Sequence, residues 1–196
     1  MKRVKLRSVL LLGIILALAG NRANALPGQV TQEVTAWINA NPTLKPAIGD
    51  GLLVQRSNSP AQRLTFQATV LPPGKVNVSP DRVTVRTETI SLFDMVNGVT
   101  RDRLQEALRV VYGLDIYQDY QRASVVYTYP SPQVLDQSRR ENRPLLAAQQ
   151  GELRLGDRYA YWVEVTKTES GKAFNGQVTV FLPEYMDKMK TELSDR

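Results

Sequence analysis

Three groups of side chains in this chain could carry a function, and the first is a set of tyrosines in alternating positions. Tyr127 and Tyr129 alternate along one predicted strand, and Tyr159 and Tyr161 alternate along another. Residues two apart on a strand point to the same face, so the four rings would form a ladder if the two strands pair. Such a ladder could stack on a glycan or a peptide. The alternative, which we favour, is that the rings serve only the sheet, because cross-strand aromatic pairs contribute roughly 0.2 to 1 kcal/mol each.

The second group is a set of acidic residues from which a general acid and a general base could be drawn, as in a glycosidase. No spacing selects a pair, and with 19 acidic residues in the chain chance proximity of two is expected. The segment from Asp115 to Asp119 also lacks the glycine-containing loop and the third ligand of a calcium site. The members are Asp115, Asp119, Glu152, Asp157 and Glu164.

The third group is the basic run Arg139, Arg140 and Arg143. Lipid headgroups or an acidic protein surface could bind it. The alternative is an ordinary solvated segment, because Glu141 and Asp136 dilute the positive charge. Both interpretations place the run at the surface.

Histidine and cysteine are both absent from the chain. Their absence excludes Ser-His-Asp and Cys-His catalysis, and it removes the common zinc, haem and iron-sulfur ligand sets. Carboxylate, Ser-Lys or tyrosine chemistry, oxygen-ligated Ca²⁺ or Mg²⁺, and plain binding remain. We therefore assign no catalytic residue, no metal ligand and no cofactor from the sequence.

The first 25 residues have the pattern of a secretory signal peptide. Basic residues precede an apolar stretch at residues 9–19, and Ala23-Asn24-Ala25 forms a small-x-small cleavage site. The apolar stretch is shorter than the roughly 20 residues that a spanning helix needs. We therefore predict cleavage after Ala25, no stable membrane span afterwards, and export to a bacterial periplasm, an equivalent lumen or the medium.

The basic character of the whole chain comes largely from this signal. Five of the 25 Lys and Arg residues and none of the 19 acidic residues precede the cleavage site, so the mature chain has a net charge of +1. A nucleic-acid partner is therefore not expected. Residues 26–196 are within the size range of one domain, and we expect a single α+β domain.

The clearest element that must position these groups is a helix. Leu104, Leu108 and Val111 lie on one face of a 3.6-residue period, Thr100 is placed to cap the helix, and Gly113 is placed to end it. Helical patterns are also present at residues 29–41, with Trp37 toward the core, and after Pro183.

Alternating patterns predict the strands. They lie at residues 52–56, 63–70, 82–93, 116–129, 151–167 as a hairpin around Gly156, and 174–182. In the strand predicted at residues 82–93, the apolar side chains change from one face to the other near Thr87, through either a β-bulge or a change of packing partner. Residues 133–150 are the least regular part, and we expect them to be a surface excursion.

This order predicts a mostly antiparallel, curved sheet of about six to seven strands, with an N-terminal, a central and a C-terminal helix packed on one side. The function expected is binding of a protein, glycan or lipid partner by an exported, non-catalytic protein, through the sheet face or through residues 133–150. Two alternatives stay open: a carboxylate-dependent hydrolase of envelope glycans, and a structural subunit with an exposed apolar patch.

Overall fold

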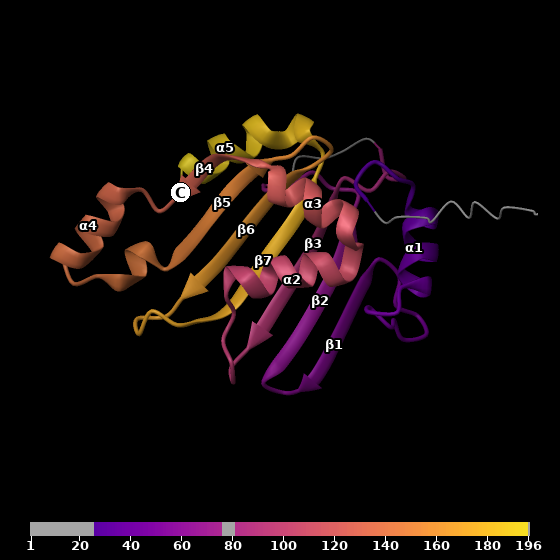
Figure 1. Ribbon diagram of the computed structural model, residues 1–196, viewed down its shortest axis with the longest axis horizontal. Helices are drawn as coiled ribbons and strands as arrows, with labels where there is room; N and C mark the ends of the chain where they lie inside the picture. Colours follow the sequence, from indigo (N-terminus) through magenta and orange to yellow (C-terminus); the bar gives the residue numbers. More distant parts are fainter. Residues whose placement is uncertain (1–25, 76–80, 196) are drawn as a thin grey trace, which may run out of the picture.

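A computed structural model of the chain describes residues 26–75 and 81–195, which form one antiparallel sheet of seven strands with helices around it (Figure 1). The strand order is β1-β2-β3-β7-β6-β5-β4, so β1 and β4 are the edges. The predicted α+β fold is confirmed. The strands are β1 Leu53–Ser59, β2 Gln62–Thr69, β3 Thr87–Asp94, β4 Ser124–Tyr129, β5 Gln149–Leu155, β6 Ala160–Lys167 and β7 Ala173–Phe181.

The helices of the described residues include the three that the sequence predicts. In α1, Trp37 lies 5.9 Å from the ring of Phe66 and 5.9 Å from the ring of Tyr112, which ties this helix to β2 and α2. The helices are α1 Thr31–Ala40, α2 Arg101–Tyr112, α3 Leu114–Arg122, α4 Pro132–Arg140 and α5 Met186–Ser194, with short 3₁₀ turns η1 Pro144–Ala147 and η2 Pro183–Tyr185.

Helix α2 forms as its sequence pattern predicts. The Thr100 side chain accepts a hydrogen bond from the backbone N–H of Arg103 at 3.3 Å, and Leu104 and Leu108 are fully buried. Gly113 follows with φ 86°, a value that favours glycine. Local signals at both ends therefore set the limits of this helix.

The predicted strand at residues 116–129 is wrong in its first half. Residues Leu114–Arg122 form helix α3, and only Ser124–Tyr129 form strand β4. The buried face of α3 consists of Ile116, Asp119 and Tyr120, at helical spacing i, i+3 and i+4. Because Asp119 is polar, the periodicity of apolar residues does not reveal this face.

The parity change near Thr87 results from a change of partner. Before it, residues 83–85 bond to the segment that precedes α1, with the backbone N–H of Val85 donating to the carbonyl of Gln29 at 2.8 Å. From Thr87 onward the chain is strand β3, paired with β2 and β7. Residues 82–86 are therefore outside the strand that the sequence predicts at 82–93.

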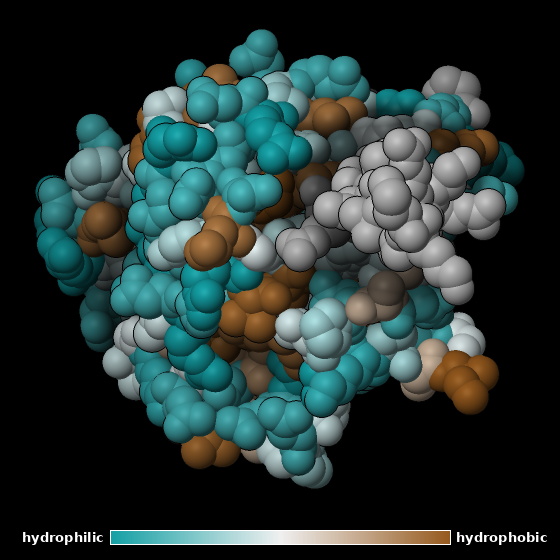
Figure 2. Space-filling model, turned by 45° about the vertical axis from the view of Figure 1, so that its right-hand side comes forward, coloured by the Kyte–Doolittle hydropathy of each residue, from teal (hydrophilic) through white to brown (hydrophobic). Residues whose placement is uncertain are grey.

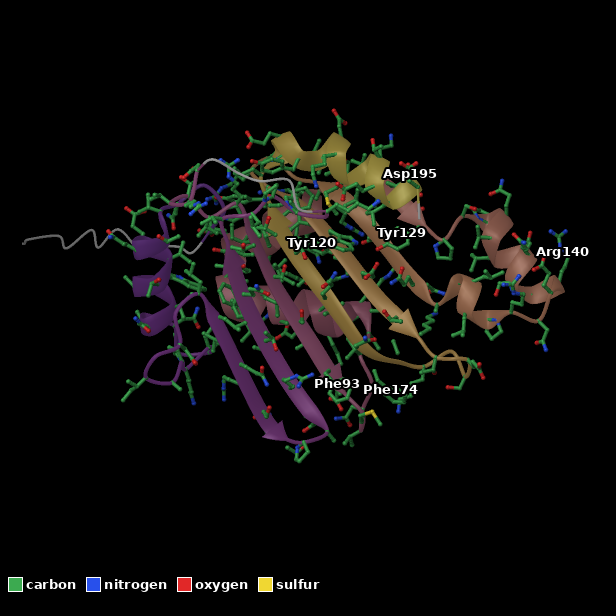
Figure 3. All side chains as sticks on the ribbon, turned by 180° about the vertical axis from the view of Figure 1, so that it is seen from behind. Phe93, Tyr120, Tyr129, Arg140, Phe174 and Asp195 are labelled. Atoms are coloured by element: carbon green, nitrogen blue, oxygen red, sulfur yellow. The ribbon has the colours of Figure 1, made fainter. Side chains whose placement is uncertain are left out.

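The two faces of the sheet carry separate hydrophobic cores. In β6, Tyr161 and Val163 belong to the core beneath α1, α2 and α3, whereas Ala160 and Trp162 belong to a smaller core with α5. Neighbouring side chains of a strand point to opposite faces, so α5 packs on the face opposite α2 (Figure 3). The expectation of helices on one side only is wrong. We call the two faces the helical face and the α5 face.

Residues 133–150 contain more regular structure than the sequence predicts. Helix α4 begins where the Ser131 side chain accepts a hydrogen bond from the N–H of Val134 at 3.3 Å, and Pro132 occupies its first turn. Helix α4 and η1 contact each other and extend away from the sheet, with Arg140 at the far end (Figure 3). The location at the surface is as predicted.

The outer surface is mostly hydrophilic in the view of Figure 2, with apolar side chains gathered in a recess near its centre. Among the described residues, no helix is both long and apolar enough to cross a membrane. The predicted signal segment, residues 1–25, lies outside the described residues.

Candidate ligand-binding site

The α5 face is only partly covered by its helix. Helix α5 lies at one end of the strands, and the other end of β2, β3 and β7 is open on this face (Figure 3). The outward side chains of these three strands are mostly hydroxyls and amides. They include Thr65, Gln67, Thr89, Ser91, Asn175 and Gln177.

The strand register brings these side chains into rows across the sheet. Ser91 of β3 is paired with Thr65 of β2 on one side and with Gln177 of β7 on the other. Gln177 is paired in turn with Glu164 of β6. The row therefore crosses four strands and ends in a carboxylate.

The neighbouring row carries a positive charge at its β2 end, whereas the first row ends in a carboxylate on β6. Arg63 of β2 is paired with Phe93 of β3, and Phe93 is paired with Asn175 of β7. The guanidinium carbon of Arg63 lies 5.5 Å from the centroid of the Phe93 ring, which is a cation–π contact. This contact holds the long Arg63 side chain across the sheet toward β3.

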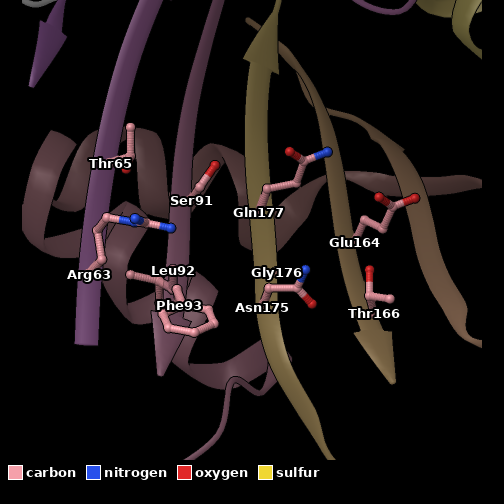
Figure 4. A pocket seen from close by; sticks show the side chains of 10 residues that line it. All are labelled: Arg63, Thr65, Ser91, Leu92, Phe93, Glu164, Thr166, Asn175, Gly176 and Gln177. Carbon is pink, nitrogen blue, oxygen red and sulfur yellow. The ribbon is translucent and has the colours of Figure 1, made fainter. Parts of the chain in front are cut away.

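The two rows enclose a hollow of about 430 Å³, which we call the polar hollow (Figure 4). Its volume is within the range of small-molecule sites, roughly 300 to 1,000 Å³. The residues that line it are Arg63, Thr65, Ser91, Leu92, Phe93, Glu164, Thr166, Asn175, Gly176 and Gln177.

Glu164 is held in the wall of the polar hollow by residues from the α5 face. The Tyr129 hydroxyl donates to Oε2 of Glu164 at 2.5 Å, and Trp162 Nε1 donates to the Tyr129 hydroxyl at 2.7 Å. Tyr129 reaches β6 by crossing β5 at Gly151, where a Cβ atom would clash with the tyrosine oxygen. Glu164 is 9% exposed, and the hydrogen bond from Tyr129 orients its carboxylate.

The predicted tyrosine ladder does not form, because β5 separates β4 from β6. Tyr161 is buried on the helical face, with its ring 5.3 Å from that of Tyr120. Tyr127 stacks on Tyr129 at 6.1 Å beside the core of the α5 face. Tyr159 is partly buried beside the core of the helical face. Of the four tyrosines, Tyr129 alone contacts the polar hollow, through Glu164.

Asp119 has a structural position. Its Oδ1 accepts hydrogen bonds from the backbone N–H groups of Asp157 at 3.0 Å and Arg158 at 3.2 Å, in the turn between β5 and β6. Its Oδ2 accepts from the N–H of Tyr159 at 3.3 Å and from the hydroxyl of Tyr161 at 2.6 Å. Burial, followed by this bond to Asp119, raises the pKa of Tyr161.

The remaining carboxylates of the predicted group do not converge on a cleft. Glu152, on the helical face, accepts from Arg154 Nε at 2.6 Å and forms an ion pair with Arg101 at 3.3 Å. Asp115 and Asp157 are exposed. Of the predicted acidic group, the polar hollow contains Glu164 alone.

The three arginines of the predicted basic run lie on the α4 and η1 segment, away from the polar hollow. Arg139 forms an exposed ion pair with Asp136 at 3.5 Å, and Arg143 forms one with Glu141 at 3.4 Å. Exposed pairs of this kind contribute about 0 to 1 kcal/mol. Asp136 and Glu141 therefore offset part of the positive charge of the basic run.

A buried carboxyl group that the sequence analysis does not single out lies on the helical face. Glu88 of β3 is fully buried and accepts a hydrogen bond from the Tyr112 hydroxyl of α2 at 2.7 Å. Its other oxygen has no hydrogen-bond partner among the described residues. Burial raises the pKa of Glu88 to about 8, so this group is mostly protonated at neutral pH.

Within residues 26–75 and 81–195, no cluster of three or more acidic side chains could hold a metal ion. Comparison of the chain with protein-family models, with curated proteins and with solved structures gave no match. The polar hollow is therefore the feature of the described residues from which we infer a function.

Most residues of the polar hollow are not among the predicted site residues, although the sequence contains a signal for them. The outward positions of a solvated strand commonly carry Lys or Glu, since charged residues make up about 25 to 35% of a typical surface. Of the outward positions of β2, β3 and β7, Arg63 is the charged one, and hydroxyls and amides dominate the others. Three strands with this bias indicate a shared polar surface.

Proposed function

We propose that this chain is an exported, non-catalytic binding protein that holds its partner in the polar hollow. The observation that carries this proposal is the uncovered part of the α5 face, where uncharged polar side chains from β2, β3, β7 and β6 line one hollow. Hydroxyl and amide groups offer directed hydrogen bonds to a ligand. They sit on paired strands, which hold them more rigidly than loops would.

A carboxylate-dependent hydrolase has less support. Glycoside hydrolysis needs two carboxyl groups on either side of the scissile bond, roughly 5 to 10 Å apart. The polar hollow offers Glu164, whereas Asp119 and Glu152 accept hydrogen bonds from protein groups on the helical face. We therefore favour binding without catalysis.

Replacing Ser91 with tryptophan is expected to reduce partner binding at least tenfold, because the indole would fill the hollow between Thr65 and Gln177. The measurement is the ¹⁵N NMR spectrum of the mature chain, recorded with and without a soluble fraction of the native envelope. Backbone signals of residues that line the polar hollow should shift in the wild type and stay unchanged in the variant.

Gln133→Trp is the matched control, since Gln133 is exposed on α4 and far from the polar hollow. This variant should respond as the wild type does. If Ser91→Trp is folded and still shows the wild-type shifts, or if the shifts fall outside the polar hollow in the wild type, this location of the binding site is wrong.

Export is tested by the mass of the protein recovered from its native cells. We expect a chain that begins at Leu26, because the signal peptidase would cleave after Ala23-Asn24-Ala25. Replacing Ala25 with a large charged residue such as Arg should leave the uncleaved precursor. Recovery of a wild-type chain that still begins at Met1 would contradict the proposal.

A further inference from the structure

We propose that the ligand of the polar hollow is a short extended peptide, with its terminal carboxylate on Arg63 and its terminal ammonium group on Glu164. This inference rests on the proposed function and names the chemistry of its ligand. It is based on the two opposite charges at the ends of the hollow and on the uncharged polar groups between them.

The Arg63 end is suited to a carboxylate. Among the described residues Arg63 forms no ion pair, and its guanidinium is held against the Phe93 ring at 5.5 Å. A guanidinium offers two parallel N–H donors that match the two oxygens of a carboxylate. Because the ring already restricts the side chain, less conformational entropy is lost on binding.

The Glu164 end is suited to an ammonium group. Tyr129 orients the carboxylate from one side through Oε2, and the low exposure of Glu164 keeps it against the wall of the hollow. A carboxylate accepts hydrogen bonds at about four positions, and an ammonium group donates three. An ammonium group that enters the hollow at this end therefore meets an oriented negative charge.

The separation of the two charges limits the peptide to a few residues. The Arg63 guanidinium lies over Phe93 of β3, and β3 is separated from β6 by the single strand β7. Two strand spacings amount to about 10 Å. An extended chain spans at most about 3.3 to 3.6 Å per residue, so a tripeptide bridges this distance.

The groups between the charges match a peptide backbone. Each peptide unit carries one donor and one acceptor that need partners when water is displaced. The side-chain amides of Asn175 and Gln177 both donate and accept, and so does the hydroxyl of Ser91. A sugar would call for a flat aromatic platform, whereas the one aromatic ring of this hollow, Phe93, is covered by Arg63.

The test uses trialanine and its two capped forms, titrated into the ¹⁵N-labelled mature chain. We expect trialanine to shift the backbone signals of the residues that line the polar hollow. Amidation of the C-terminus removes the negative charge, and acetylation of the N-terminus removes the positive one. Each cap should weaken binding about tenfold.

Two variants assign each charge to its partner. In Arg63→Gln, amidation of the peptide should have no further effect, while acetylation should still weaken binding. In Glu164→Gln, which keeps an acceptor for Tyr129, the pattern should be reversed. Arg122→Gln, at an exposed arginine of α3 outside the polar hollow, is the matched control and should behave as the wild type.

The outcomes separate this inference from the proposed function. If trialanine binds in the hollow equally well with and without caps, or if chitobiose or phosphocholine shifts these signals and trialanine does not, the peptide inference is wrong and the hollow still binds a ligand. If the envelope fraction also leaves the signals of the hollow unchanged, the proposed function itself fails.

Discussion

Replacing Asp119 with alanine is expected to lower the free energy of unfolding by about 4 kcal/mol, a large part of the 5 to 15 kcal/mol typical of a domain. Asp119 is 1% exposed and joins α3 to the turn between β5 and β6. Its removal leaves the N–H groups of that turn without their acceptor, and it leaves the Tyr161 hydroxyl with the carbonyl of Ile116, at 3.5 Å, in place of Asp119 at 2.6 Å. The cost of such unpaired groups is about 1 to 3 kcal/mol each when they are buried.

Urea unfolding of the mature chain at neutral pH measures the free energy of unfolding. In thermal unfolding at the same pH, the melting temperature should fall by about 10 °C. Asp115→Ala is the matched control, because Asp115 lies on the same helix and is exposed. It should change the stability by no more than about 0.5 kcal/mol. Equal stability of the two variants would show that the hydrogen bonds of Asp119 do not hold the turn in solution.

The second large effect is a loss of stability as the pH rises from about 5 to 8, caused by Glu88. Burial raises the pKa of Glu88 from its ordinary value of 4.5 to about 8 in the folded chain. The folded state therefore holds this proton more tightly than the unfolded state does. The contribution is fully present below pH 4.5, decreases between pH 4.5 and 8, and changes no further above pH 8. The total change is about 5 kcal/mol, since each pKa unit corresponds to about 1.4 kcal/mol.

The composition of the chain makes this effect measurable. With no histidine, no imidazole titrates between pH 5 and 8. Glu88→Gln keeps the shape of the side chain and removes the charge, so its stability should be nearly constant over this range. Urea unfolding of the wild type and the variant at pH 5, 6, 7 and 8 compares the two curves.

Glu106→Gln is the control for the loss of a carboxylate. The hydrogen bond from Arg109 lowers the pKa of Glu106, which is exposed on α2, so this group is ionised throughout the range tested. The control should keep the pH dependence of the wild type. Parallel curves for the wild type and Glu88→Gln would mean that Glu88 is not buried as a neutral acid.

Short-range patterns predict a good part of this fold. Helix α2 follows from the spacing of Leu104 and Leu108 together with its caps, because a helix is stabilised by contacts a few residues apart. The hairpin of β5 and β6 follows from Gly156 and the alternation on either side of it. In both cases the determining residues are neighbours in the chain.

The errors arise where one polar residue or a distant partner decides the structure. Helix α3 is mistaken for a strand because Asp119 occupies a buried position that apolar periodicity assigns to a hydrophobic residue. The tyrosine ladder fails because Tyr129 and Tyr161 lie on strands separated by β5 and on opposite faces of the sheet. No pattern within a single strand contains that information.

By itself the sequence determines the class of the fold, the limits of its most regular elements, and the exclusion of imidazole and thiol chemistry. The tertiary structure alone decides the candidate site. Thr89 is paired with Thr179, 90 residues further along the chain, and only such long-range pairing places the outward faces of β2, β3 and β7 side by side. The same pairing sets Arg63 and Glu164 at opposite ends of one hollow, because the strand order is a property of the whole sheet.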